Sequence, residues 1–169
     1  MDPNMIINAP SLSLATTLLI EHTFPPLSKR YRENRYLMDR AILCAKNTNV
    51  QKLNNQIIKY LPTEERCYRS FDSAPEDLHN IYQVEYLNEI SLPSFPPHNL
   101  ILKVGCPIIL LRNLDKQNGL CNGSRIVVVK LHPNFIEAEV SSGDHMVKTV
   151  YIPRIPLDSF KYQWSPICF

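Results

Sequence analysis

The chain has 169 residues, 44% hydrophobic and 20% charged, which is typical of one ordinary globular domain or two small ones. Its 18 basic and 16 acidic residues leave a net charge of +2, so total charge neither favours nor excludes a polyanionic partner. The five cysteines form no Cys-x-x-Cys pair and the five histidines no closely spaced pair, which argues against a zinc site and a disulfide framework.

Residues 1–28 are expected to form an irregular lead-in, because they show little periodicity and contain prolines at positions 3, 10, 25 and 26. The apolar run at 11–20 has no basic residue before it and is too short to span a bilayer. It predicts neither a signal peptide nor a membrane anchor, so we expect an intracellular chain with no membrane partner.

Charge is distributed in three blocks. Residues 29–60 carry eight basic and two acidic residues, 61–98 carry two and seven, and 99–135 carry five and one. Two basic stretches therefore flank an acidic one. This pattern fits nucleic-acid contact through two separated surfaces, but solvated helix faces produce similar blocks, and both interpretations stay open.

Residues 41–62 predict a strand followed by a helix, the unit from which parallel α/β sheets are built. The short apolar run 41–45 suits a buried strand, and Pro62 ends the helix that follows. The apolar positions on one face of that helix are Val50, Leu53, Ile57, Ile58 and Leu61.

The polar residues between this strand and helix are the first candidate ligands. In a parallel sheet ligands gather at the carboxyl ends of strands, which is where Lys46, Asn47 and Asn49 would lie. Asn47, Thr48 and Asn49 are also good helix N-caps, so capping is the structural alternative.

Residues 62–98 are acidic and rich in proline, and they predict a connector with one short helix at 84–90. From Asn99 onward hydrophobicity alternates with a period of two, which favours a small antiparallel barrel or sandwich. The expected strands are 100–104, 107–112, 125–131, 135–140 and 147–152.

All four glycines lie in this second half, at Gly105, Gly119, Gly123 and Gly143. None is followed by lysine, so the chain has no Walker A loop to cradle a nucleotide phosphate. A Gly-x-Ser-x-Gly elbow is also absent, and no catalytic residue is predicted.

Several segments occur in a fixed order: "RAILCAKNTNVQKLNNQII", "YQVEYLNEI", "GLCNGSRIVV" and "VYIPRIPL". From about Phe24 to Pro156 the chain resembles the petite-integration-frequency helicases, specifically the version carried by Helitron transposons. The run Leu-Arg-Asn-Leu-Asp followed by Gly-Leu-Cys-Asn-Gly-Ser-Arg is its most specific signature. The resemblance implies a nuclear, ATP-dependent DNA helicase of superfamily one that moves 5′ to 3′ on single strands.

The resemblance also implies a domain organisation and an α+β fold class. Residues 29–62 would be a fragment of the second RecA-like α/β domain (2A) with helicase motif IV, and 63–98 a connector. Residues 99–156 would form the 2B domain, a small antiparallel Src-homology-three-like β-barrel, and 157–169 a truncated return towards 2A. The family often has proline where this chain has Ala45, which puts the loop shape there in doubt.

The stretch "LDKQNGLCNGSRIVVVK" contains two Asn-Gly pairs, whereas one would close a hairpin. We expect the first pair to turn the chain and the second to re-enter the ladder with positive φ, giving a wide, shaped loop. The loop would present charge and backbone donors to a DNA phosphate path; the alternative is a turn whose glycines only satisfy backbone geometry. The candidate DNA-binding residues are Arg112, Lys116, Asn118, Gly119, Asn122, Gly123, Ser124 and Arg125.

The complete family enzyme uses ATP and magnesium, but this chain lacks the P-loop, Walker B and motifs V and VI, so we expect no bound cofactor and no activity alone. Its expected partners are single-stranded DNA and a separate helicase ATPase domain. A stand-alone single-stranded DNA-binding module and a protein-interaction module are the alternatives. Base stacking or core packing is open for the aromatic residues Phe135, Tyr151, Phe160, Tyr162 and Trp164.

Overall fold

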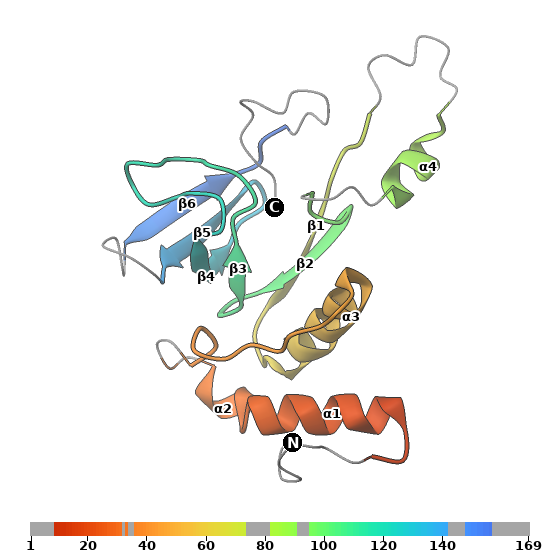
Figure 1. Ribbon diagram of the computed structural model, residues 1–169. Coiled ribbons are helices and arrows are strands. Elements are labelled where there is room, and N and C mark those ends of the chain that lie inside the picture. Colours follow the sequence, from red (N-terminus) through yellow and green to blue (C-terminus); the bar gives the residue numbers. More distant parts are fainter. Residues whose placement is uncertain are drawn as a thin grey trace.

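The computed structural model describes residues 9–31, 33, 36–73, 82–90, 95–141 and 148–156. Helices occur together with two antiparallel sheets, so the α+β class is confirmed. In Figure 1, α3 lies between α1 and the two-stranded β1–β2 sheet, and the four-stranded sheet lies beyond them. The elements are α1 (Leu12–Thr23), α2 (Leu27–Arg30), α3 (Asn47–Ile57), a 3-10 turn (Ile58–Tyr60), β1 (Glu65–Arg69), α4 (Val84–Glu89), β2 (Asn99–Lys103), β3 (Pro107–Ile109), β4 (Arg125–Leu131), β5 (Phe135–Val140) and β6 (Thr149–Pro153).

Helix α1 corrects the expectation of an irregular lead-in, although residues 1–8 lie outside the described part. The side chain of Ser11 caps the helix by accepting a hydrogen bond from the Leu14 N–H at 3.3 Å. Pro10 precedes the cap, and Pro25 follows Phe24 at the other end. The prolines therefore bracket the helix instead of interrupting it, which is where prolines are tolerated.

The predicted helix after residue 46 is confirmed as α3, but the predicted strand at 41–45 is wrong. A strand needs a neighbour for its N–H and C=O groups, and neither described sheet includes these residues. Leu43 is 94% exposed. Lys46 is the N-cap and makes no side-chain cap bond, and Asn47 begins the helix, so the alternative in which Asn47, Thr48 or Asn49 caps the helix is also wrong.

The acidic connector contains strand β1, which was not predicted, and helix α4, which was. Strand β1 pairs antiparallel with β2 in the register Glu65↔Lys103 to Arg69↔Asn99. Burial alternates along β1, with Tyr68 buried, but the sequence Glu-Arg-Cys-Tyr-Arg is too polar to show the alternation of apolar residues by which a half-buried strand is predicted.

The second sheet has the order β3-β4-β5-β6, with antiparallel pairs throughout. Strands β4 and β5 have the predicted bounds, β3 is shorter, and β6 begins after Val147, which lies outside the described residues. A β-bulge shifts the register between Val128 and Lys130. Neither described sheet closes on itself, so a closed barrel is not confirmed.

One apolar core joins the helices to both sheets. Its largest fully buried side chains come from the four-stranded sheet: Ile126, Val128, Ile136 and Ile152. Polar bonds add to the junction, since the Tyr68 hydroxyl donates to the His132 carbonyl at 2.8 Å and the Arg154 guanidinium donates to the Arg69 carbonyl. The four-stranded sheet is thus held against the two-stranded β1–β2 sheet.

Candidate nucleic-acid interface

The chain between β3 and β4 makes two successive turns, and the first is built on Asp115. The Asp115 carboxylate accepts hydrogen bonds from the N–H groups of Gln117 at 3.1 Å and Asn118 at 3.2 Å. Gly119 then takes φ +76°, and the Leu120 N–H returns to the Asp115 carbonyl at 2.8 Å. This is an Asx-type turn that needs glycine at its left-handed position.

The second turn brings the chain back to β4. Gly123 has φ +85°, and its N–H donates to the Leu110 carbonyl at 2.7 Å. The Asn122 N–H donates to the Asn113 side-chain carbonyl at 2.9 Å. The predicted positive φ before Arg125 is therefore confirmed.

The Ser124 hydroxyl joins the two turns. It accepts from the Cys121 N–H at 3.1 Å and donates to the Gly119 carbonyl at 2.8 Å. Two Asn-Gly pairs are present because the chain reverses twice, and one side chain holds the reversals together. We call residues 110–124 the double-turn loop.

Replacing Ser124 by alanine should lower the free energy of unfolding by about 1 kcal/mol, because the Cys121 N–H loses its acceptor. Urea unfolding followed by circular dichroism measures the change. Ser141→Ala is the matched control, since its hydroxyl has no hydrogen bond within the described residues. Equal effects of the two substitutions would contradict the role given to Ser124.

Electrostatics also hold the double-turn loop to the sheet. A hydrogen bond from the Asn118 amide lowers the pKa of the Asp115 carboxyl below its ordinary value, and the charge of Lys148 acts in the same direction. The Lys148 ammonium donates to the Asn118 side-chain carbonyl, next to the start of β6. Lys148 was not predicted as part of this region, because 30 residues separate it from Asn118.

The three predicted basic residues of the loop region have different surroundings. Lys116 is exposed, whereas Arg112 is half-buried with its guanidinium 5.5 Å from the centroid of the Phe95 ring. Arg125 is exposed, and its Nη1 donates to the Met38 carbonyl at 3.1 Å. Arg125 therefore links the sheet to the first basic stretch, so the two stretches meet at this point instead of forming fully separate surfaces.

The other predicted group, Lys46, Asn47 and Asn49, is exposed at the start of α3. Figure 1 shows α3 beside the two-stranded β1–β2 sheet. The double-turn loop lies at the far side of the four-stranded sheet, near β6. The structure therefore does not bring the two predicted groups together.

Two of the aromatic candidates lie side by side on β5 and β6. The rings of Phe135 and Tyr151 meet edge to face with centroids 5.9 Å apart, and Tyr151 is 62% exposed. His132 stacks on Phe135 at 4.1 Å. Phe160, Tyr162 and Trp164 lie outside the described residues, as does Gly143.

Among the described residues we find neither a glycine turn that leads into a helix nor a cluster of metal-ligating side chains. The left-handed glycines Gly105, Gly119 and Gly123 lie in turns between strands, and none opens a helix whose N–H groups could bind a phosphate. Within the same ranges no three His, Cys, Asp or Glu side chains come together as ligands. No described helix is long and apolar enough to cross a membrane.

Comparison with known proteins shows that this chain is similar to one family of DNA helicases. Residues 85–131, from α4 to the end of β4, match the family model of the DNA helicase Pif1 2B domain. The chain is 35% identical over 91 residues to the ATP-dependent DNA helicase PIF1 of Danio rerio, and 32% identical over 88 residues to that of Xenopus laevis. The resemblance to Pif1-type DNA helicases is confirmed.

The two vertebrate alignments cover 54% and 52% of this chain but only 13% and 12% of the relatives. Two solved structures cover 88% of the chain at 23% identity. One, from work on DNA unwinding at forked double-stranded DNA by two coordinating Pif1 helicases, has a TM-score of 0.46 with 32% of its own chain covered. The other, Bacteroides sp Pif1 in complex with ADP-AlF4, has a TM-score of 0.47 with 30% covered.

Proposed function

We propose that this chain is a segment of a Pif1-type, ATP-dependent 5′-to-3′ DNA helicase, and that its part is to contact single-stranded DNA. The observation that carries the proposal is that the matched 2B segment contains the whole double-turn loop together with Arg112, Lys116 and Arg125. In this proposal domain 2A would begin with residues 29–62, and the barrel-like 2B domain would be formed by residues 99–156. The connector between them would be 63–98, and the chain would return towards 2A at 157–169.

The chemistry of the loop supports this role. Its backbone is fixed by two left-handed glycines and the Ser124 hydroxyl, so its groups need little ordering when a strand binds. Lys116 supplies an exposed positive charge, and Arg112 a guanidinium already placed against a ring. Such groups bind phosphates without reading sequence, and release counterions on binding.

By itself the chain would not hydrolyse ATP. Its sequence has no Gly-x-x-x-x-Gly-Lys-Ser/Thr loop, and phosphoryl transfer depends on the backbone donors and lysine of that loop. A separate helicase ATPase domain would supply them, and the assembly would act in the nucleus.

The test is fluorescence anisotropy of a labelled single-stranded oligonucleotide at several salt concentrations. We expect saturable binding that weakens steeply with salt, and Lys116→Ala to weaken it about threefold and reduce the salt slope by roughly 0.7. Lys59→Ala is the matched control, an exposed lysine beside α3 and away from the loop. Binding that ignores both salt and Lys116 would contradict the proposal.

The alternative is a stand-alone module that binds single-stranded DNA or another protein. The aromatic pair of half-buried Phe135 and exposed Tyr151 favours some contact surface on the sheet, but Glu137 and Glu139 lie on the same sheet face. Binding to protein with no salt-sensitive DNA affinity would favour the protein-interaction module over the helicase segment.

A further inference from the structure

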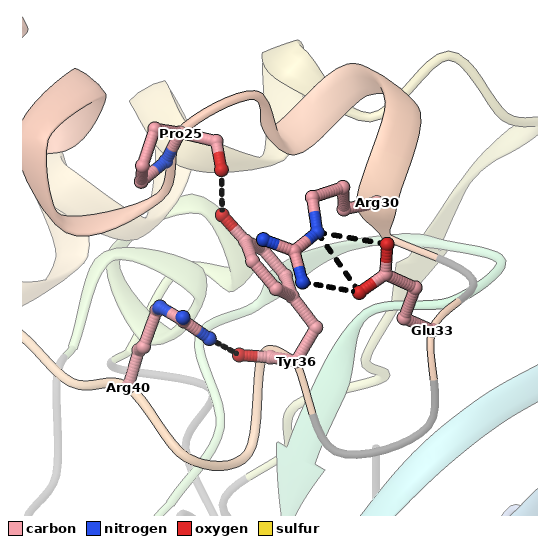
Figure 2. A network of polar contacts seen from close by, with 5 residues as sticks. All are labelled: Pro25, Arg30, Glu33, Tyr36 and Arg40. Carbon is pink, nitrogen blue, oxygen red and sulfur yellow. Dashed lines mark hydrogen bonds and ion pairs between the residues drawn. The ribbon is translucent and has the colours of Figure 1, made fainter.

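Tyr36 organises the basic segment that leads into α3. Its side chain is only 3% exposed, and its hydroxyl donates to the Pro25 carbonyl at 2.7 Å (Figure 2). Two guanidiniums lie against its ring, with Arg30 Cζ at 4.7 Å and Arg40 Cζ at 4.3 Å from the centroid. The ring therefore fixes both positive groups in place.

The two arginines differ in what neutralises them. Arg30 makes a two-pronged ion pair with Glu33, with Nε to Oε1 at 2.8 Å and Nη2 to Oε2 at 2.6 Å, and this pair lowers the pKa of Glu33. Arg40 bonds only neutral groups, the ring and the Tyr36 carbonyl at 3.0 Å. No ion pair joins Arg40 to a carboxylate of the described residues, although its side chain is half-buried. Its charge also helps to lower the pKa of Glu33, but less than the hydrogen-bonded Arg30 does.

Arg125 reaches the same segment from strand β4. Its Nη1 donates to the Met38 carbonyl at 3.1 Å, across 87 residues of sequence, and it too has no ion pair among the described residues. Arg40 and Arg125 thus bond carbonyls two residues apart. By sequence, residues 29–40 carry five basic side chains against the two carboxylates of Glu33 and Asp39, so this segment is positive before Arg125 is counted.

We propose that Arg40 and Arg125 together bind one phosphate group of a single-stranded DNA backbone. This deepens the proposed function and rests on it. Each guanidinium carries five N–H donors and uses one for the hydrogen bond to a backbone carbonyl, so donors remain for phosphate oxygens. The site lies at the junction of the two basic stretches, where a strand could pass from the N-terminal segment to the sheet.

The first experiment is a double-mutant cycle of Arg40→Gln and Arg125→Gln, read by anisotropy with a single-stranded oligonucleotide. Each substitution should weaken binding about threefold to tenfold and reduce the salt slope by roughly 0.7. The double variant should lose less than the product of the single losses, because both side chains hold one phosphate. Thermal unfolding checks that each variant is folded.

Arg30→Gln is the matched control, since Arg30 touches the same ring but is already neutralised by Glu33. It should leave the affinity nearly unchanged. If folded Arg40→Gln and Arg125→Gln variants keep the full salt slope while Lys116→Ala reduces it, the arginine site is wrong and the proposed function stands.

A second arm tests the site without DNA. A chain labelled with ¹⁵N-arginine is titrated with inorganic tripolyphosphate, and the arginine Nε–H resonances are followed. Saturable shifts concentrated on Arg40 and Arg125 would support a phosphate site at these two residues. If the oligonucleotide nevertheless failed to bind, the proposed function would be wrong but the phosphate site would stand. Equal shifts at all arginines would overturn the site.

Discussion

Replacing Ile136 by alanine should lower the free energy of unfolding by about 3 kcal/mol. The Ile136 side chain is 0% exposed, in a strand that pairs on both sides. Its Cα neighbours are Leu131 on β4 and Ile152 on β6, both buried. The substitution removes buried methyl groups and leaves a cavity that two hydrogen-bonded neighbours prevent from collapsing.

Urea unfolding monitored by far-ultraviolet circular dichroism measures this loss. Val129→Ala is the control, because Val129 is 37% exposed and lies at the bulge where the register shifts. It should cost less than 1 kcal/mol. If the two variants unfolded at the same urea concentration, the sheet would not have the packed interior described here.

The strands around Ile136 were also the part of the fold that sequence predicted best. In β5 apolar and polar residues alternate from Ile136 onward, whereas β4 is a nearly continuous apolar run. In both strands the buried positions Ile126, Val128, Ile136, Ala138 and Val140 recur with a period of two. Alternation reports a sheet with one buried face, so it predicts the strand bounds directly. It says nothing of closure, which depends on pairing between distant edge strands, and the expected barrel is not confirmed.

Sequence analysis failed where hydrophobicity does not show whether a segment pairs as a strand. Strand β1 buries only Tyr68 and was assigned to the acidic connector, while the apolar run 41–45 looked like a strand but lacks a neighbour. Propensity and composition do not reveal whether a partner strand is available. Helix α1 was missed because its flanking prolines were counted as disruption instead of as boundaries.

In the candidate site too, local sequence predicts some features and not others. The left-handed glycines of the double-turn loop follow from the Asn-Gly pairs, since local backbone chemistry decides them. The bond from Arg125 to Met38 does not follow from any local pattern, because it joins residues 87 apart. The two basic stretches can be located by counting charges along the sequence. That they are in contact, through the hydrogen bond from Arg125 to Met38, is seen only in the fold.

Replacing Tyr36 by alanine should lower the free energy of unfolding by about 3 kcal/mol, because a buried aromatic ring that packs between α2 and the segment leading to α3 is lost. Tyr36→Phe keeps the ring and its contacts with both guanidiniums, and removes only the hydroxyl bond to the Pro25 carbonyl. It should cost about 1 kcal/mol. Urea unfolding separates the two contributions.

The pair of Tyr36 variants also separates packing from positioning. If the ring holds Arg40 for a phosphate, Tyr36→Phe should keep the affinity for a single-stranded oligonucleotide, because the contact at 4.3 Å survives. Tyr36→Ala, measured at a temperature where it is folded, should weaken binding as much as Arg40→Gln does. A folded Tyr36→Ala variant with unchanged affinity would show that the ring stabilises the fold without orienting Arg40.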